Sequence, residues 1–289
     1  MSPTCKNAAH FGCIAAIQMN STPDMQANLE NAQRLLAEAV ATGARLVVFP
    51  ENFALLGVED IQAAGRTEAE NRSAQTVRRW LAKKAREYGV WMIAGSIPMA
   101  SRPGGEALSD RVRAACLVLD DQGHEVARYD KIHLFDVDVE DDYGAYRESD
   151  TVEAGCELVV VDTPCGKVGL SICYDLRFAE QYYRLRELGA EIITVPSAFT
   201  ATTGEAHWEP LLRARAIESQ CYLVAPNQTG WHTDSRHSWG HSMIIDPWGR
   251  VLDTLPDEPG VISAQVDLSY LKEVRRRMPV AQHHRLQGL

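Results

Sequence analysis

The chain contains no run of apolar residues long enough to cross a lipid bilayer. None of the apolar segments in its 289 residues approaches the roughly 20 residues that a membrane-spanning helix needs. The opening segment, MSPTCKNAAHFG, also lacks a basic stretch followed by an apolar core, so no secretion signal is visible. We therefore expect a cytoplasmic protein that does not enter membranes.

Basic residues are scarce relative to acidic ones. The 29 lysines and arginines face 39 aspartates and glutamates, which gives a formal net charge of −10 at pH 7. Nucleic acids and anionic membrane surfaces attract proteins through basic patches, so this balance argues against both as partners. The hydrophobic content of 45% and the charged content of 24% are typical of a globular protein with a sizeable core.

Paired cysteine motifs and zinc-binding motifs are absent as well. The 7 cysteines are odd in number, scattered and without a CxxC pair, which is typical of reduced thiols in a cytoplasm. They are Cys5, Cys13, Cys116, Cys156, Cys165, Cys173 and Cys221. Four late histidines raise the question of zinc: His207, His232, His237 and His241. Because neither an HExxH motif nor paired CxxC spacing accompanies them, we expect no metal site.

Strand-like and helix-like segments alternate along the whole chain, which predicts one α/β domain over residues 1–289. The predicted strands cover residues 11–18, 45–49, 90–97, 111–119, 125–129, 158–162, 168–172, 191–195, 221–225, 241–245, 250–253 and 261–266. The predicted helices follow Pro23–Asp24 as far as Gly43, and cover residues 71–88, 177–189 and 208–220, the last with Pro210 in its first turn. The acidic segment 136–151 is expected to be irregular.

The stretch KVGLSICYDLRFAE, residues 167–180, places a cysteine between a predicted strand and a predicted helix. A thiol at such a junction is close to the N–H groups of the helix N-terminus, which stabilise a thiolate and can also hold an oxyanion. Cys173 is therefore a candidate nucleophile. The alternative is that Cys173 is a small buried apolar residue, as most free cysteines are.

Two further charged residues follow predicted strands in the same way. Glu51 comes after LVVFP, and Lys131 comes after EVARYD. Taken singly, either is an ordinary surface residue, but residues at strand ends are where sites are usually built. A carboxylate beside a thiol can accept its proton and later activate water, and an ammonium can stabilise a tetrahedral oxyanion.

The segments FPENF, RYDKIHLFD and SICYDLRF, in this order, resemble the Glu–Lys–Cys signatures of the nitrilase (carbon–nitrogen hydrolase) superfamily. The resemblance extends over nearly the whole chain, from Ile14 to the HHRL near its end. Two later segments, SAFTATTGEAHWEPLLRARAIESQCY and GHSMIIDPWG, are similar to the branch whose members hydrolyse amides of α-keto acids. The resemblance implies an α-β-β-α sandwich with a core at about residues 11–270. It also implies a homodimer or higher homo-oligomer, with the tail 271–289 at a subunit interface.

The resemblance also implies roles for individual residues. Cys173 would be the nucleophile, Glu51 the general base and Lys131 the group that stabilises the oxyanion. The backbone N–H of Tyr174 would be a second oxyanion donor, and Glu148, in the segment YRES, would line the site.

Two residues are candidates for substrate binding. Arg177 would bind the carboxylate of an α-keto acid, because guanidinium groups bind carboxylates bidentately. Its alternative is a local ion pair with Asp175 or Glu180. Thr203 belongs to a polar segment, residues 200–204 (TATTG), which is expected to be a loop that frames the pocket, or simply a loop.

These observations favour a cofactor-free amidase that acts on a small-molecule amide. An amidase for smaller α-keto amides is the nearest alternative. A Cys–His hydrolase with His133 or His207 as base would leave Glu51 and Lys131 unexplained. A catalytically silent scaffold is a further alternative, against which the intact glutamate, lysine and cysteine argue.

Overall fold

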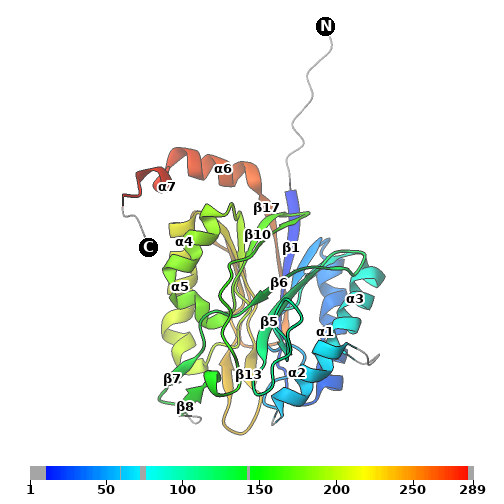
Figure 1. Cartoon of the computed structure of the whole chain (residues 1–289). Helices are drawn as coiled ribbons and strands as arrows, with labels where there is room; N and C mark the ends of the chain where they lie inside the picture. The colour runs from blue at the N-terminus through cyan, green and yellow to red at the C-terminus, as the bar shows by residue number, and fades with distance from the viewer. Residues whose placement is uncertain (1–10, 59, 72–75, 142–143, 286–289) are drawn as a thin grey trace.

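Two large β-sheets face each other in the computed structural model, and helices cover their outer faces (Figure 1). The structure describes residues 11–285 except 59, 72–75 and 142–143. The seven-stranded sheet runs in the order β17 (Gly260–Asp267), β1 (Phe11–Gln18), β2 (Leu46–Val48), β3 (Trp91–Ile93), β5 (Arg113–Leu119) and β4 (Ile97–Met99), with β6 (Glu125–Asp130) paired to β5. The six-stranded sheet runs in the order β16 (Val251–Thr254), β15 (Met243–Ile245), β12 (Tyr222–Ala225), β11 (Ile192–Thr194), β10 (Gly166–Leu170) and β9 (Val160–Thr163).

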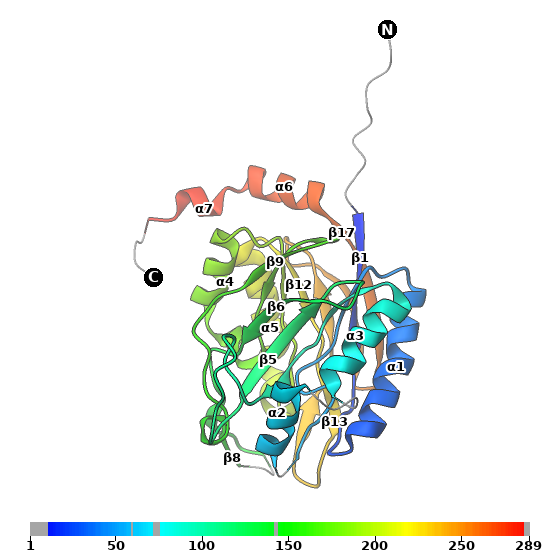
Figure 2. The same cartoon turned by 45° about the vertical axis from the view of Figure 1, so that its right-hand side comes forward.

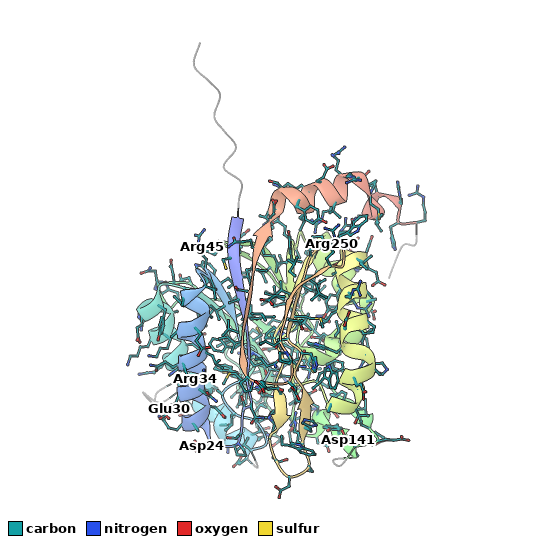
Figure 3. All side chains as sticks on the ribbon, turned by 180° about the vertical axis from the view of Figure 1, so that it is seen from behind. Asp24, Glu30, Arg34, Arg45, Asp141 and Arg250 are labelled. Carbon is teal, nitrogen blue, oxygen red and sulfur yellow. The ribbon has the colours of Figure 1, made fainter. Side chains whose placement is uncertain are left out.

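Each sheet carries its own helices. Helices α1 (Met25–Ala41) and α3 (Val77–Tyr88) cover the seven-stranded sheet, whereas α4 (Ala179–Glu187) and α5 (Ala201–Ser219) cover the six-stranded sheet (Figures 1 and 2). From behind, α1 in blue lies on one side of the two sheets and α5 in yellow lies on the other (Figure 3). Helices α6 (Leu268–Arg277) and α7 (Val280–His283) run across one end of the molecule. This arrangement confirms the predicted α-β-β-α sandwich. None of the helices in the described part of the chain is long and apolar enough to span a bilayer.

Strand β1 shows how the sequence builds the layers. Ile14 and Ala16 belong to the core that includes the inner faces of both sheets, whereas Ala15 and Ile17 belong to the core beneath α1. Successive side chains of a strand point to opposite faces, so a strand buried on both faces reads as a continuous apolar run. Burial of an isoleucine side chain, as at Ile14 and Ile17, contributes about 1.5–3 kcal/mol to folding.

Local capping signals set the bounds of α1 and α3. Asp24 caps α1 by accepting the N–H of Ala27 at 3.0 Å, as the sequence predicted. The helix predicted over residues 71–88 begins later, at Val77, because Asn71 adopts a left-handed conformation that ends another helix, α2 (Ile61–Glu70). Helix α2 was not predicted, and it buries only Gly65 and Glu68.

Two other predicted elements differ from the structure. The strand predicted over residues 90–97 is two strands, β3 and β4, because the chain turns at Gly95 with φ of 58°. Any Cβ at Gly95 would lie 1.9 Å from the carbonyl oxygen of Pro50, so only glycine fits this turn. The strand predicted over residues 168–172 instead covers Gly166–Leu170.

Helix α5 begins much earlier than the sequence predicted. Residues 200–204 do not form a loop. Thr200 is the N-cap residue of α5, and Ala201 is its first helical residue. Pro210 therefore lies inside the helix rather than in its first turn. Buried contacts of Trp208 and Leu212 on either side of this proline stabilise the helix despite its missing N–H.

Short elements gather at the end of the sandwich opposite α6 (Figures 1 and 2). The acidic segment predicted as irregular forms strands β7 (Asp136–Asp138) and β8 (Ala145–Arg147), followed by a 3₁₀ turn, Glu148–Asp150. The hairpin of β13 (Thr229–Trp231) and β14 (His237–Trp239) also lies at this end. In Figure 3, Asp141 marks this end and Arg250 lies toward the other.

Candidate active site

A cavity of about 600 Å³ contains most of the residues that the sequence singled out. Those that line it are Glu51, Lys131, Glu148, Cys173, Tyr174 and Thr203. They come from segments of both sheets and from the short elements at this end of the sandwich. Arg177 is the one predicted site residue that is not in the cavity lining.

Glu51 lies just beyond β2 and is fixed between the two halves of the sandwich. Its Oε1 accepts a hydrogen bond from Nζ of Lys131 at 2.8 Å, and its Oε2 accepts the backbone N–H of Ala198 at 2.8 Å. Ala198 follows β11 of the opposite sheet, and the Glu51 side chain is almost entirely buried. Both carboxylate oxygens therefore have fixed positions before any substrate arrives.

Lys131 follows β6 and lies between two carboxylates. Besides its contact with Glu51, its Nζ lies 3.0 and 2.9 Å from the two carboxylate oxygens of Glu148. Glu148 also accepts the N–H of Phe135 at 2.7 Å. Burial opposes the charge on Lys131, but Glu148 and Glu51 outweigh burial and raise its pKa well above the ordinary value. Lys131 is therefore an ammonium ion at neutral pH.

Cys173 lies at a sharp turn after β10. Its φ of 47° is in the left-handed region, which non-glycine residues seldom adopt and which marks a constrained backbone. Its N–H donates to the carbonyl oxygen of Pro196 at 2.9 Å, which anchors the turn to the end of β11. Cys173 begins a short 3₁₀ helix, Cys173–Arg177, and α4 begins only at Ala179, so the helix predicted from Arg177 onward is displaced.

The thiol of Cys173 is in its protonated form in this site at neutral pH. Burial raises its pKa far above the ordinary value, the carboxylate of Glu51 adds to the rise, and Lys131 opposes it. The thiolate that the sequence suggested for a helix N-terminus is therefore not the resting state. A thiol of this kind becomes a nucleophile when a neighbouring base accepts its proton during attack, and the carboxylate of Glu51 lies close enough to affect the pKa of this thiol.

Asp175, which was considered only as a partner for Arg177, connects the cysteine turn with the segment around Lys131. This fully buried carboxylate accepts the O–H of Tyr129 at 2.6 Å, the N–H of Ile172 at 2.8 Å and the N–H of His133 at 3.0 Å. Tyr129 and His133 flank Lys131 in the sequence, so Asp175 fixes the backbone on both sides of the lysine. Its position two residues after Cys173 is the feature of the sequence that could have pointed to this role.

His133 does not occupy the place of a base for Cys173. Its Nδ1 lies 2.8 Å from the carboxylate of Asp175, and its ring stacks on Phe178 with centroids 3.6 Å apart. His133 is also not in the lining of the cavity. These contacts indicate that His133 stabilises the structure beside the Cys173 turn.

Arg177 lies behind one wall of the cavity. Its guanidinium is 5.8 Å from the ring centre of Tyr174 and 5.2 Å from that of Phe199, and both of these residues line the cavity. Its Nη1 lies 3.3 Å from Nδ1 of His207. No ion pair joins Arg177 to Asp175 or Glu180, so the local pairing considered from the sequence does not occur.

Three arginines that the sequence did not single out also line the cavity: Arg113, Arg147 and Arg236. No local pattern marks them, because each reaches the cavity from a different strand or loop. Among the residues that the structure describes, no group of three or more His, Cys, Asp or Glu side chains is placed to hold a metal ion. Two of the four late histidines bind backbone carbonyl oxygens instead: His232 that of Ser21, and His241 that of Trp239.

Comparison with known proteins identifies the family of the chain. Residues 13–276 match the carbon–nitrogen hydrolase family. A deaminated glutathione amidase from Yersinia enterocolitica is 43% identical over 272 residues, which cover 94% of this chain and 92% of that protein.

Solved structures show the same fold. The NitFhit protein of C. elegans superimposes with a TM-score of 0.85 at 38% identity, covering 96% of this chain and 66% of that chain, slightly less than two thirds of its length. An amidase of the nitrilase superfamily from Nesterenkonia sp. AN1 gives a TM-score of 0.75 at 25% identity, covering 96% of this chain and 100% of that chain. This chain therefore belongs to the carbon–nitrogen hydrolase family, and it is a hydrolase of carbon–nitrogen bonds in linear amides.

Proposed function

We propose that Cys173, Glu51 and Lys131 carry out amide hydrolysis through a thioester on Cys173, without a cofactor. The observation that carries this proposal is the buried contact between Lys131 and Glu51 in the cavity that Cys173 also lines. The carboxylate is held close enough to affect the thiol pKa, and the ammonium is held by two carboxylates. These are the parts that acyl transfer requires: a nucleophile, a base and a cation for the oxyanion.

The reaction proceeds in two halves. Glu51 accepts the proton of the Cys173 thiol as sulfur bonds to the amide carbon, and Lys131 and the Tyr174 N–H stabilise the resulting oxyanion. Collapse breaks the carbon–nitrogen bond, and the leaving amine takes the proton from Glu51, which leaves a thioester. Glu51 then accepts a proton from water, hydroxide attacks the thioester, and the proton returns to the departing sulfur.

A solved relative supports the covalent step. The structure of the Nesterenkonia amidase, in a variant with glutamine in place of a glutamate, has the acetamide moiety of fluoroacetamide covalently attached to its active-site cysteine. That observation concerns the relative. By analogy, Cys173 is the residue to which an acyl group would attach here.

We propose deaminated glutathione as the substrate, a glutathione whose α-amino group has become a keto group. The similarity to relatives named for this activity supports the choice. Arg177 would attract the α-keto carboxylate electrostatically from behind the cavity wall that Tyr174 and Phe199 form. Thr203 would line the same pocket. The alternative is an omega-amidase that acts on α-ketoglutaramate or α-ketosuccinamate, which offer the same carboxylate but release only ammonia.

We expect kcat/KM for deaminated glutathione to exceed that for α-ketoglutaramate by at least about tenfold, because contacts with the larger leaving group can be used in the transition state. Both compounds carry the same acyl group, so the comparison isolates the effect of the leaving group on kcat/KM. Product formation is measured by mass spectrometry for each compound. A preference for α-ketoglutaramate would show that the omega-amidase alternative is correct, and unchanged kinetics in Arg177→Met would place the carboxylate anchor elsewhere.

Replacing Lys131 by methionine should lower kcat by about 10²–10³-fold, because one oxyanion-stabilising group is lost. The same change leaves the buried Glu51 and the partly buried Glu148 without their shared cation, which should lower the free energy of unfolding by about 3–5 kcal/mol. Steady-state kinetics and urea denaturation measure the two effects separately. Lys167→Met is a matched control, since Lys167 is half-exposed and pairs only with Asp162. Wild-type turnover in Lys131→Met would remove the lysine from the mechanism.

We further propose a cytoplasmic homo-oligomer with the C-terminal tail at a subunit interface. The six described cysteines are all free, which fits a reducing compartment. Met278 and Val280 in the tail expose 46% and 39% of their surface, and such apolar residues favour a protein contact. Analytical ultracentrifugation that finds only monomers would contradict this proposal.

A further inference from the structure

The cationic residues that line the cavity differ in whether they are already paired with carboxylates. They are Lys131, Arg113, Arg147 and Arg236. Lys131 is held by Glu51 and Glu148, as described above. A cation whose charge is already balanced gains less from a substrate carboxylate than one without a partner, so the pairing of the three arginines is informative.

Two of these arginines have acidic partners. Arg113 forms an ion pair with Glu153 and lies 3.9 Å from Asp130. Arg147 lies 2.6 Å from the carboxylate of Asp138, and its guanidinium also donates to backbone carbonyl oxygens. Asp150, the other acidic residue in the lining besides the two glutamates, contributes to the raised pKa of Arg147.

Arg236 is different. Across the described part of the chain, its guanidinium has neither a hydrogen bond nor an ion pair, although the side chain is partly buried and lines the cavity. Its backbone is well fixed, since its N–H donates to the hydroxyl of Thr233 at 3.1 Å and its carbonyl oxygen accepts the N–H of His232 at 2.9 Å. The backbone of the loop is therefore anchored on both sides of an unpaired arginine that lines the cavity, which lowers the entropic cost of binding a carboxylate there.

The loop that carries Arg236 lines a different part of the cavity from the wall behind which Arg177 lies. It joins β13 to β14 and contacts the segment after β2, since a Cβ at Gly57 would lie 2.9 Å from the Thr233 methyl. Gly57 and Thr233 both line the cavity. Arg177, in contrast, lies behind Tyr174 and Phe199, on the side of the 3₁₀ helix. His232 in the same loop is neutral at pH 7, because burial lowers its pKa to about 4.

We infer that Arg236 binds the carboxylate at the C-terminal end of the leaving group, and so selects an amide whose amine portion is a short peptide. This inference rests on the proposed function. Deaminated glutathione has two carboxylates, one on each side of the amide that is cleaved, because its leaving group is cysteinylglycine. The small α-keto amides have only the carboxylate on the acyl side. A second arginine in a separate part of the cavity therefore has a use only with the larger substrate.

The test compares deaminated glutathione with its C-terminal amide, in which the glycine carboxylate is replaced by a neutral carboxamide. For the wild type, we expect kcat/KM to be about 10–100-fold higher for the acid, because a charge-assisted hydrogen bond is lost in the amide. Arg236→Met should lower kcat/KM for the acid by a similar factor and leave that for the amide nearly unchanged. Arg236→Lys should restore part of the preference, and hydrolysis of α-ketoglutaramate should be unaffected by either change.

Arg147→Met is the matched control, because this arginine lines the same cavity but is already paired with Asp138. It should leave the ratio of the two kcat/KM values as in the wild type. Equal losses on acid and amide in Arg236→Met would show a structural role for the loop and overturn the inference. The absence of any wild-type preference for the acid would also overturn it. If the wild type cleaves other amides but not deaminated glutathione, the proposed substrate is wrong, a result distinct from the first two.

Discussion

Replacing Cys173 by alanine will abolish amide hydrolysis while the fold remains intact. Removal of a nucleophile that acts together with its base lowers turnover by about 10⁴-fold or more. Among the described residues that line the cavity, Cys173 is the one thiol. The substitution removes only the sulfur atom from a side chain that is 8% exposed, so the thermal midpoint should change little.

Cys116→Ala is the control for this experiment. Cys116 is fully buried in the core between the sheets and does not line the cavity, so this variant should retain activity. Mass spectrometry of the wild type after brief mixing with substrate should find an acyl adduct on the peptide that contains Cys173. Turnover near the wild-type rate in Cys173→Ala would rule out the thioester mechanism.

Replacing Glu51 by glutamine should lower turnover by about 10²–10⁴-fold, the usual effect of removing a general base. The amide has the shape of the carboxylate, and its oxygen can still accept the N–H of Ala198. Its NH₂ group, however, faces the ammonium of Lys131 and cannot accept the proton of the thiol.

The pH dependence of thiol alkylation provides a second readout for Glu51→Gln. The negative charge of Glu51 contributes to the raised pKa of Cys173, so its removal should lower that pKa. The half-maximal rate of alkylation of Cys173 should therefore occur at lower pH in the variant, even though turnover is lost. Glu153→Gln, at a carboxylate outside the cavity lining, serves as a control. If Glu51→Gln turned over substrate normally, another group would have to be the base.

The parts of the fold that the sequence predicted well have signals within the element itself. Strand β1 was predicted with its observed bounds, since it is buried on both faces and therefore apolar throughout. Helix α1 carries a cap at Asp24 and a regular apolar stripe. In contrast, Ile61 is the one large apolar residue of α2, and the first turn of α5 is composed of residues typical of loops.

The beginning of α5 depends on contacts that no local pattern encodes. A Cβ at Gly204 would lie 2.3 Å from the side chain of Trp239, so this turn is packed tightly against β14. Tertiary packing of this kind overrides the low helix propensity of residues 200–204.

In the candidate site, too, some features are marked by local sequence and others arise only from tertiary contacts. Glu51, Lys131 and Cys173 could be predicted because each follows a strand within a recognisable segment. Their mutual geometry could not, since Glu51 and the Ala198 N–H that fixes it are 147 positions apart in the sequence. Arg236 could not be singled out either, because its distinction is the lack of a partner, a property that exists only in the folded chain.

The groups proposed to react come from both sheets, so activity should depend on the position of one sheet relative to the other. Glu51 and Lys131 extend from strands of the seven-stranded sheet, and Cys173 extends from a strand of the six-stranded sheet. Neither sheet alone holds a complete set of groups for the reaction. A slight sliding of one sheet over the other would separate base from sulfur while every ladder of hydrogen bonds within the sheets stayed intact. Under the proposed mechanism, such a displacement should stop amide hydrolysis while the helix and strand content stays unchanged, so a probe of secondary structure would not detect the loss.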